Sequence, residues 1–561
     1  MQRTYIRTSA VVIAAVISLA SVAPAQAAPA DLKAKADAYL KSAYPAAGPG
    51  AAVIIMDDGK IVYAAGQGLA DIEARKPITP QTVFRLGSIT KQFSAAVLLQ
   101  LVDEGKVSLD DKLSKYLPTF PKPGADATIR QLLNHTVGVQ SYTGIPGWMV
   151  EENTNRPYTT EQMIALFKDL PAPSKPGEKF AYNNSGYVLV GAVIEKVTGK
   201  PWHQAVEERL TRPLKLGTIR YGVGESGFPN MAKGYTDGEQ GPKLASKIHM
   251  SVPHAAGALV GSVEDLAKWG YALHRGKVVS AGSYSSMIAP TKLPDGTTLP
   301  YGFGLSEGEV RGRKAVGHGG GIFGFSTDSI YIPEEDVYVA VFTNSDDPQT
   351  GAGTAMRRLA ALAIGDPYPD FKKEAVDVAS LEPLFGVYTF KEGERRFYAR
   401  DGQLFTQRTG GPESKVFYAG GDRYFYGPES LNWFQIRRDP AGAHVMEMHQ
   451  NGANQPERSV RSGPIPPEAP TAAVPRATLE TYAGSYSVGP ATAVVALQGE
   501  GLTVKLGGQE ARGLRPISAT QFRVEGVDAR VTFVAENGGV TRMVINHGGR
   551  EMSAERVKTG S

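Results

Sequence analysis

The chain of 561 residues contains no cysteine, although glycine and proline are common, with 64 and 38 residues. The absence of cysteine excludes disulfide bonds, thiolate metal ligands and a lipid-modified cysteine. An excess of charge is also lacking: the formal net charge is only +4, which gives no indication of a nucleic-acid partner. The nine histidines show no H-E-x-x-H spacing. We therefore expect no metal and no cofactor.

Long apolar runs are scarce as well. The one such run near the N-terminus, "AVVIAAVISLASVA", is shorter than the ~20 residues needed to span a bilayer. Arg3 and Arg7 precede it, and the small residues "AQA" at 25–27 follow it. This order is typical of a secretory signal peptide over residues 1–27. We expect a periplasmic or secreted protein with no membrane span after cleavage.

Residues 28–368 show the pattern of one mixed α+β domain. Residues 51–70 predict a hairpin around the turn "DDGK". The four-residue spacing of Ile89, Phe93, Val97 and Leu101 predicts a helix that ends before Gly105. Helical patterns continue to about residue 275, and the segments "FSTDSIYIP" and "VYVAVFTN" then predict strands. Strands at both ends of the region predict an antiparallel sheet with a helical subdomain between its halves.

The C-terminal part carries an internal repeat at an offset of 98 residues. The linker "GPIPPEAPTAAVPR" separates the copies, and each copy has short strand patterns between turns. We predict two tandem small antiparallel β-barrels of lipocalin-like type at 378–463 and 477–558, joined by a Pro-rich linker at 464–476. The matching pairs are Leu381/Leu479, Gly386/Gly484, Tyr388/Tyr486, Leu404/Leu502, Tyr424/Phe522, Val445/Met543 and His449/His547.

Ser88 and Lys91 in "FRLGSITKQF" are the first candidate catalytic pair. Residues three apart on a helix share one face, with Cβ atoms ~5–6 Å apart, so the lysine amine can reach the serine oxygen. A serine needs a base to become a nucleophile. A lysine kept neutral by burial or by a nearby positive charge can be that base. Ser88 also precedes a helix N-terminus, which favours developing negative charge.

Two further motifs follow in order. "AYNNSGY" places Tyr182 and Asn184 before a helix, and "GHGGG" places His318 near the last strands. S-x-x-K, then Y-x-N, then H-x-G resemble the serine β-lactamase and penicillin-recognising serine hydrolase superfamily. The similarity is greatest to its class C β-lactamase, DD-peptidase, D-aminopeptidase and esterase branch. "TIRQLLNHTVGV", "AAGALVGSVEDLAKW" and "YGFGL" agree with it, and the resemblance covers about residues 45–365.

The resemblance implies a role for each motif residue. Ser88 is the acylated nucleophile, Lys91 its proton partner, and Tyr182 a general base or acid, expected as a phenolate. Asn184 is expected to hold a substrate amide, together with Gly319 and Gly320. The backbone N–H groups of Ser88 and Gly321 form the oxyanion hole. His318 takes the place of the basic residue of K-T-G and is expected to contact a substrate carboxylate or relay protons.

The predicted function is a secreted serine hydrolase acting on small peptides, amides or esters, of D-aminopeptidase, DD-carboxypeptidase or esterase type. β-Lactam hydrolysis and a catalytically weak protein that binds cell-wall peptides remain alternatives. An α/β-hydrolase is discarded because G-x-S-x-G is absent. His135, His449 and His547 are interpreted as structural. The barrels could mediate oligomerisation, and "GGPES" or "GGDRYFYGPES" could reach the active site.

Overall fold

The computed structural model describes residues 29–238, 240–391, 393–466, 472–488, 491–507, 510–536, 539–547 and 550–557. The expected signal peptide, at 1–27, and part of the Pro-rich linker lie outside the described residues. Within the described ranges, no helix is long and apolar enough to cross a bilayer.

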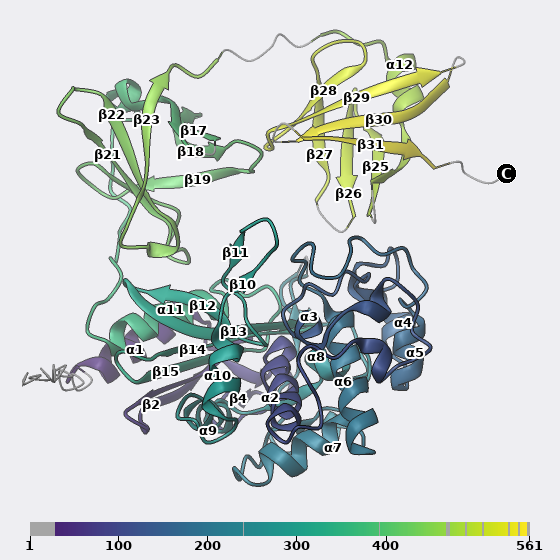
Figure 1. The fold of residues 1–561 in the computed structure, drawn as a ribbon. Helices are drawn as coiled ribbons and strands as arrows, with labels where there is room; N and C mark the ends of the chain where they lie inside the picture. The colour runs from purple at the N-terminus through teal and green to yellow at the C-terminus, as the bar shows by residue number, and fades with distance from the viewer. Residues whose placement is uncertain are drawn as a thin grey trace, which may run out of the picture.

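A six-stranded antiparallel sheet forms the centre of the first domain (Figure 1). Its order is β12-β13-β14-β15-β1-β2, so the first hairpin of the chain joins strands from almost 300 residues later. The predicted hairpin at 51–70 and the two predicted late strands are confirmed as β1–β2 and β14–β15. The strands are β1 (Ala51–Asp57), β2 (Lys60–Gln67), β12 (Ser306–Val310), β13 (Arg313–Ile322), β14 (Phe325–Ile332) and β15 (Val337–Thr343).

Two sets of helices cover the sheet because each of its faces is apolar. Helices α1 (Leu32–Ala43) and α11 (Ala352–Ala363) bury one face. The other face joins a large core with α9 (Val263–His274), α2 (Thr90–Asp103) and α6 (Asn184–Thr198). Phe93 of α2 stacks on Trp269 of α9 with ring centroids 4.0 Å apart. Apolar burial of this kind fixes α2 in place at the centre of the domain.

Shorter elements complete the helical subdomain. The helices are α3 (Ile129–Leu133), α4 (Glu151–Thr154), α5 (Thr160–Ala165), α7 (Trp202–Val206), α8 (His254–Gly257) and α10 (Ala281–Ile288). The short strands are β3 (Leu69–Asp71), β4 (Lys76–Pro77), β5 (Phe84–Arg85), β6 (Arg220–Tyr221), β7 (Tyr235–Thr236), β8 (Lys243–Leu244), β9 (Leu259–Gly261), β10 (Thr291–Lys292) and β11 (Thr298–Leu299).

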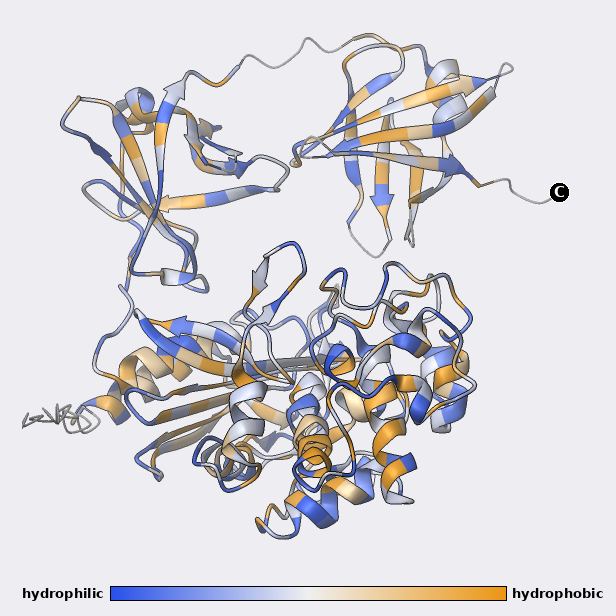
Figure 2. Cartoon of the chain, in the orientation of Figure 1, coloured by the Kyte–Doolittle hydropathy of each residue, from blue (hydrophilic) through white to orange (hydrophobic). Residues whose placement is uncertain are grey.

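Two closed eight-stranded barrels follow, as the repeat predicted. Apolar and polar residues alternate along many of their strands (Figure 2), which is the pattern of a filled small barrel. Barrel 1 contains β16 (Gly386–Phe390), β17 (Gly393–Arg400), β18 (Gln403–Arg408), β19 (Glu413–Tyr418), β20 (Arg423–Phe425), β21 (Trp433–Arg438), β22 (His444–His449) and β23 (Glu457–Gly463). Barrel 2 contains α12 (Arg476–Tyr482), β24 (Gly484–Val488), β25 (Ala491–Gln498), β26 (Gly501–Leu506), β27 (Arg512–Pro516), β28 (Gln521–Val524), β29 (Ala529–Glu536), β30 (Gly539–His547) and β31 (Arg550–Arg556).

Both barrels close through the same latch. A tyrosine on the first strand donates to the carbonyl four residues earlier, and an arginine on the last strand donates to a carbonyl just before the first strand. The pairs are Tyr388–Leu384 (2.6 Å) and Arg461–Phe385 (3.0 Å) in barrel 1, and Tyr486–Tyr482 (2.8 Å) and Arg556–Ala483 (2.6 Å) in barrel 2.

The barrel loops that the sequence singled out contact other parts of the protein. The "GGPES" loop (410–414) bonds to barrel 2, where Glu413 N–H donates to Gly526 O at 3.0 Å. The second loop (420–430) meets α11, because Arg358 donates to the carbonyls of Pro428 and Ser430. Whether one of these loops reaches the active site was left open by the sequence, and no hydrogen bond among the described residues joins either loop to Ser88 or Lys91.

Candidate active site

Ser88 lies in a 3₁₀ turn, Gly87–Ile89, that leads directly into α2. Gly87 has a φ of +53°, a conformation that costs an L side chain energy and suits glycine. A Cβ on Gly87 would come within 3.0 Å of the Gly321 amide nitrogen. The turn therefore presses the nucleophile segment closely against β13, with Ser88 at the positive end of α2.

Lys91 is completely buried, at 0% exposure. Its Nζ lies 3.0 Å from Ser88 Oγ, 2.9 Å from Asn184 Oδ1 and 2.9 Å from the Ala256 carbonyl oxygen. Burial holds the pKa of Lys91 well below its usual value, because removal from water disfavours the charged form. A neutral amine has two N–H groups for the two carbonyl-type oxygens, and its lone pair then faces the Ser88 hydroxyl. This is the geometry of a general base.

Tyr182 lies on the other side of Ser88. Tyr182 is 43% exposed, and its hydroxyl forms a hydrogen bond with Ser88. Burial of the hydroxyl raises the pKa of Tyr182, and the hydrogen bond from Ser88 opposes this only in part. Burial therefore favours the neutral phenol over the phenolate that the resemblance implied, and the protonation state of Tyr182 stays a prediction. A phenol is suited to donate a proton.

Asn184, the first residue of α6, links Lys91 to Thr143 in the loop between α3 and α4. Its Oδ1 accepts from Lys91, and its Nδ2 donates to Thr143 Oγ1 at 3.3 Å. The expected contact of Asn184 with a substrate amide stays a prediction. The bond to Thr143 is long, so a substrate carbonyl could compete for Nδ2.

His318 occupies β13 and is 9% exposed. Its Nε2 lies 2.9 Å from the Tyr301 hydroxyl, and its Nδ1 lies 2.5 Å from the Gly319 carbonyl oxygen. A carbonyl only accepts, so Nδ1 carries the proton and Tyr301 donates to Nε2. Burial lowers the pKa of His318 to about 4, because removal from water disfavours the charged imidazolium. At neutral pH His318 therefore supplies no positive charge for a substrate carboxylate.

The three glycines after His318 have different surroundings. A Cβ on Gly320 would lie 2.1 Å from Leu86 O and 3.0 Å from Ser88 N, so this glycine allows the nucleophile segment to touch β13. Gly319 faces Asp328 on the neighbouring strand, whereas Gly321 faces open space. The amides of Ser88 and Gly321 lie on these two adjoining segments, where an oxyanion hole is expected.

Two groups in the site were not assigned from the sequence. The carbonyl of Ala256 in α8 accepts from Lys91, and the hydroxyl of Tyr301 fixes His318. Both lie in the segments "AAGALVGSVEDLAKW" and "YGFGL", which were quoted for the resemblance without a role. A carbonyl group leaves no trace in residue identity, but a tyrosine next to a glycine-rich stretch could have been considered.

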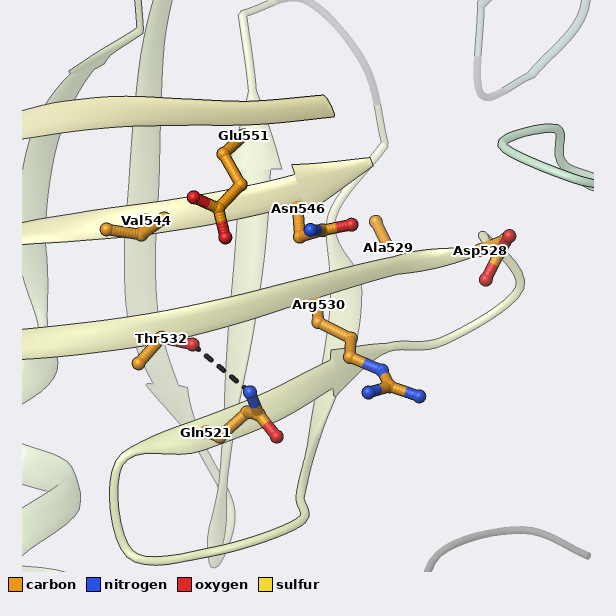
Figure 3. A pocket seen from close by; sticks show the side chains of 8 residues that line it. All are labelled: Gln521, Asp528, Ala529, Arg530, Thr532, Val544, Asn546 and Glu551. Carbon is orange, nitrogen blue, oxygen red and sulfur yellow. Dashed lines mark hydrogen bonds between the residues drawn. The ribbon is translucent and has the colours of Figure 1, made fainter. Parts of the chain in front are cut away.

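A hollow elsewhere in the described residues lacks this chemistry. The hollow in Figure 3, about 270 Å³, lies on barrel 2, where Gln521 Nε2 donates to Thr532 Oγ1 at 3.4 Å. Its lining contains no serine beside a base; the residues are Gln521, Asp528, Ala529, Arg530, Thr532, Val544, Asn546 and Glu551. In the described parts of the chain, no group of three or more His, Cys, Asp or Glu residues could hold a metal ion.

A serine beside a buried lysine of lowered pKa, a tyrosine and two adjoining backbone amides is the arrangement of a serine hydrolase with an S-x-x-K nucleophile. The pattern of the Beta-lactamase family matches residues 40–363. The chain therefore belongs to the Beta-lactamase family, and the predicted family and fold class are both confirmed.

Similar proteins agree with this assignment. The chain is 25% identical to penicillin-binding protein 4* of Bacillus subtilis over 73% of this chain and 94% of that protein. It is 25% identical to a D-aminopeptidase of Gluconobacter oxydans over 73% of this chain and 74% of that one. An octameric penicillin-binding protein homologue from Pyrococcus abyssi has 25% identity and a TM-score of 0.55 over 76% of this chain and 99% of that one. A D-stereospecific amidohydrolase from Streptomyces has 29% identity and a TM-score of 0.50 over 59% and 98%.

Proposed function

We propose that this serine hydrolase cleaves D-aminoacyl amides, small peptides from their amino end, or esters, through a Ser88 acyl-enzyme. The observation that supports this substrate class most directly is the neutrality of the site. Burial lowers the pKa of both Lys91 and His318, which favours the uncharged form of each side chain. Arg85, three residues before Ser88, is paired with Glu225, with Nε 2.9 Å from Oε1.

A substrate with a carboxylate beside the scissile bond needs a cation to balance that charge in a buried site. None of Lys91, His318 and Arg85 supplies a free cation for this purpose. A carboxypeptidase or a β-lactamase must bind such a carboxylate, whereas an amidase, aminopeptidase or esterase need not. The names of two relatives, a D-aminopeptidase and a D-stereospecific amidohydrolase, point in the same direction.

The proposed reaction divides proton transfer between two residues. Lys91 takes the Ser88 proton while Oγ attacks the carbonyl carbon, and the amides of Ser88 and Gly321 stabilise the oxyanion. Tyr182 gives its proton to the leaving amine or alkoxide and recovers one from the Lys91 ammonium. Water then attacks the acyl-enzyme, with the same groups acting in reverse.

A substrate panel tests the proposal. D-Phenylalanine amide, a D-Ala-D-Ala peptide, p-nitrophenyl acetate and nitrocefin are compared for kcat/KM, with Ser88→Ala as the control. We expect the amide or the ester to exceed both carboxylate-bearing substrates by at least about tenfold, the equivalent of one unfavourable charge contact. A faster D-Ala-D-Ala peptide would overturn the substrate assignment. Absence of any covalent fluorophosphonate adduct on Ser88 would overturn the hydrolase function and favour a peptide-binding protein.

Secretion and assembly are part of the same proposal. The sequence pattern of residues 1–27 supports export. Cell fractionation of the tagged full chain tests this, and a protein retained in the cytoplasm would contradict it. The octameric state of the Pyrococcus abyssi homologue supports an oligomer here. Sedimentation of the full chain and of a variant that lacks both barrels would show whether the barrels mediate oligomerisation.

A further inference from the structure

His135 is buried and has a strained backbone for its residue type. It is 1% exposed and has a φ of +62°, a left-handed conformation that few residues other than glycine adopt. Its Nε2 has no hydrogen-bond partner among the described residues. Such features cost stability and are rarely kept without a function.

The contacts of His135 converge on Tyr182. The His135 carbonyl accepts from the Ala181 amide at 3.0 Å, and its Nδ1 accepts from the Asn183 amide at 3.0 Å. The two residues that flank Tyr182 are thus both held by one histidine. The ring of His135 also packs on the Tyr182 ring with centroids 4.3 Å apart. These three contacts fix both the backbone and the ring of Tyr182.

The ring of His135 lies between Tyr182 and the Tyr301–His318 pair. Its centroid lies 4.6 Å from that of Tyr301, whose hydroxyl bonds to His318, and 5.3 Å from that of Tyr187. Lys91 Nζ lies 4.8 Å from the Tyr182 ring and 5.4 Å from the Tyr187 ring. His135 therefore stands behind the aromatic side chains that cover the Lys91 amine.

We propose that His135 is a positioning residue that clamps Tyr182 against Ser88 and seals the aromatic wall over the Lys91 amine. The inference rests on the proposed hydrolase function. His135 acts as a neutral ring: Nδ1 accepts from Asn183, so the proton resides on Nε2. Burial holds the pKa of His135 well below its usual value.

The titratable neighbours of the Lys91 amine are few. Tyr182 and Tyr187 face it from the α6 side, and His318 of β13 and His135 of the turn after α3 both lie within electrostatic range of it. Helix α8 contributes only the backbone carbonyl of Ala256. If the His135 ring is removed, water gains access to the Lys91 amine, and the pKa of Lys91 moves up toward that of an exposed lysine.

His135→Asn is the test variant because asparagine tolerates positive φ and its Oδ1 can still accept from Asn183. The rate of Ser88 labelling by a fluorophosphonate is measured by intact mass from pH 5 to pH 10. We expect labelling at pH 7 to slow about ten- to a hundredfold, as for a misplaced catalytic group. We also expect the acid side of the pH profile to move to higher pH.

His449→Asn is the matched control. His449 is also a buried histidine with an unpartnered Nε2, and it stacks on Trp433 in barrel 1, with centroids 3.9 Å apart. Its replacement should leave Ser88 labelling unchanged. His135→Phe is a second test variant: it keeps a ring but loses the acceptor for Asn183, so labelling should slow without a shift in the pH profile.

The outcomes separate the clamp from the function. A folded His135→Asn variant with wild-type rate and profile overturns the proposal. A loss of rate with an unmoved profile in the same variant overturns the seal over the Lys91 amine, because this variant removes the ring and keeps the acceptor for Asn183. If the wild-type protein itself gives no Ser88 adduct, the proposed hydrolase function fails first. Thermal melting of each variant establishes that it is folded.

Discussion

Replacement of Gly320 by alanine perturbs the contact between β13 and the nucleophile. The added Cβ would lie 2.1 Å from Leu86 O and 2.5 Å from Thr327 Oγ1. Real Cβ contacts are essentially never shorter than 3.0 Å, so the two segments must separate by about 3.0 − 2.1 = 0.9 Å. Both neighbours are held, because Thr327 Oγ1 itself donates to Leu86 O at 2.9 Å.

This separation has two measurable effects. Overpacking of a tight contact costs about 1–3 kcal/mol of unfolding free energy. A shift of roughly 1 Å between Ser88 and the amide of Gly321 misplaces the oxyanion hole, and a misplacement of that size costs about a hundredfold in rate. We therefore expect Gly320→Ala to lose activity by about two orders of magnitude and to remain folded at room temperature.

Fluorophosphonate labelling of Ser88 and calorimetric melting measure these effects. Gly308→Ala is the matched control, because Gly308 lies in β12 of the same sheet and a Cβ there meets nothing within 4 Å. It should label at the wild-type rate. If Gly320→Ala labels as fast as Gly308→Ala, the close packing of β13 on Ser88 does not set the rate, and the reasoning is refuted.

Three further predictions concern the buried titratable groups Lys91 and Asp328. Lys91→Met keeps the bulk but removes the amine, so labelling should fall by about 10²–10⁴-fold, the usual contribution of a general base, and an unchanged rate would rule Lys91 out as the base. In the wild type the rate should be lost as pH falls through the depressed Lys91 pKa. Burial raises the pKa of Asp328 to about 6 from 3.8, so its protonated form stabilises the fold below pH 4 and that contribution is lost as pH rises through about 6. Asp328→Asn should therefore gain up to about 3 kcal/mol of unfolding free energy over the wild type between pH 4 and pH 7, and a pH-independent difference in urea melts would contradict this.

Local spacing was enough to predict part of the site. Ser88 and Lys91 are three residues apart, and their contact follows from helical geometry alone. The barrels were predictable for a similar reason, because their repeated residues are the barrel interiors: Tyr388 and Tyr486 are both 0% exposed. Where a feature depends on neighbours in the sequence or on a repeat, the sequence carries it directly.

Protonation states could not be predicted in the same way. They depend on burial by segments far apart in the chain, such as Ala256, which is 165 residues from Lys91. The phenolate expected at Tyr182 is an example, since burial raises the pKa of this tyrosine and disfavours that form. The neutrality of His318 depends likewise on burial and on Tyr301, 17 residues before it in the chain.

The latch that closes each barrel has a consequence for how this architecture could arise. Because a tyrosine and an arginine of the same copy form the closing hydrogen bonds, each barrel closes without residues from the other barrel at this point. A unit of this kind can be duplicated in one step and still fold. Its outer loops are then free to diverge. In barrel 1 the loop at 420–430 now bonds to helix α11, and the loop at 410–414 bonds to barrel 2.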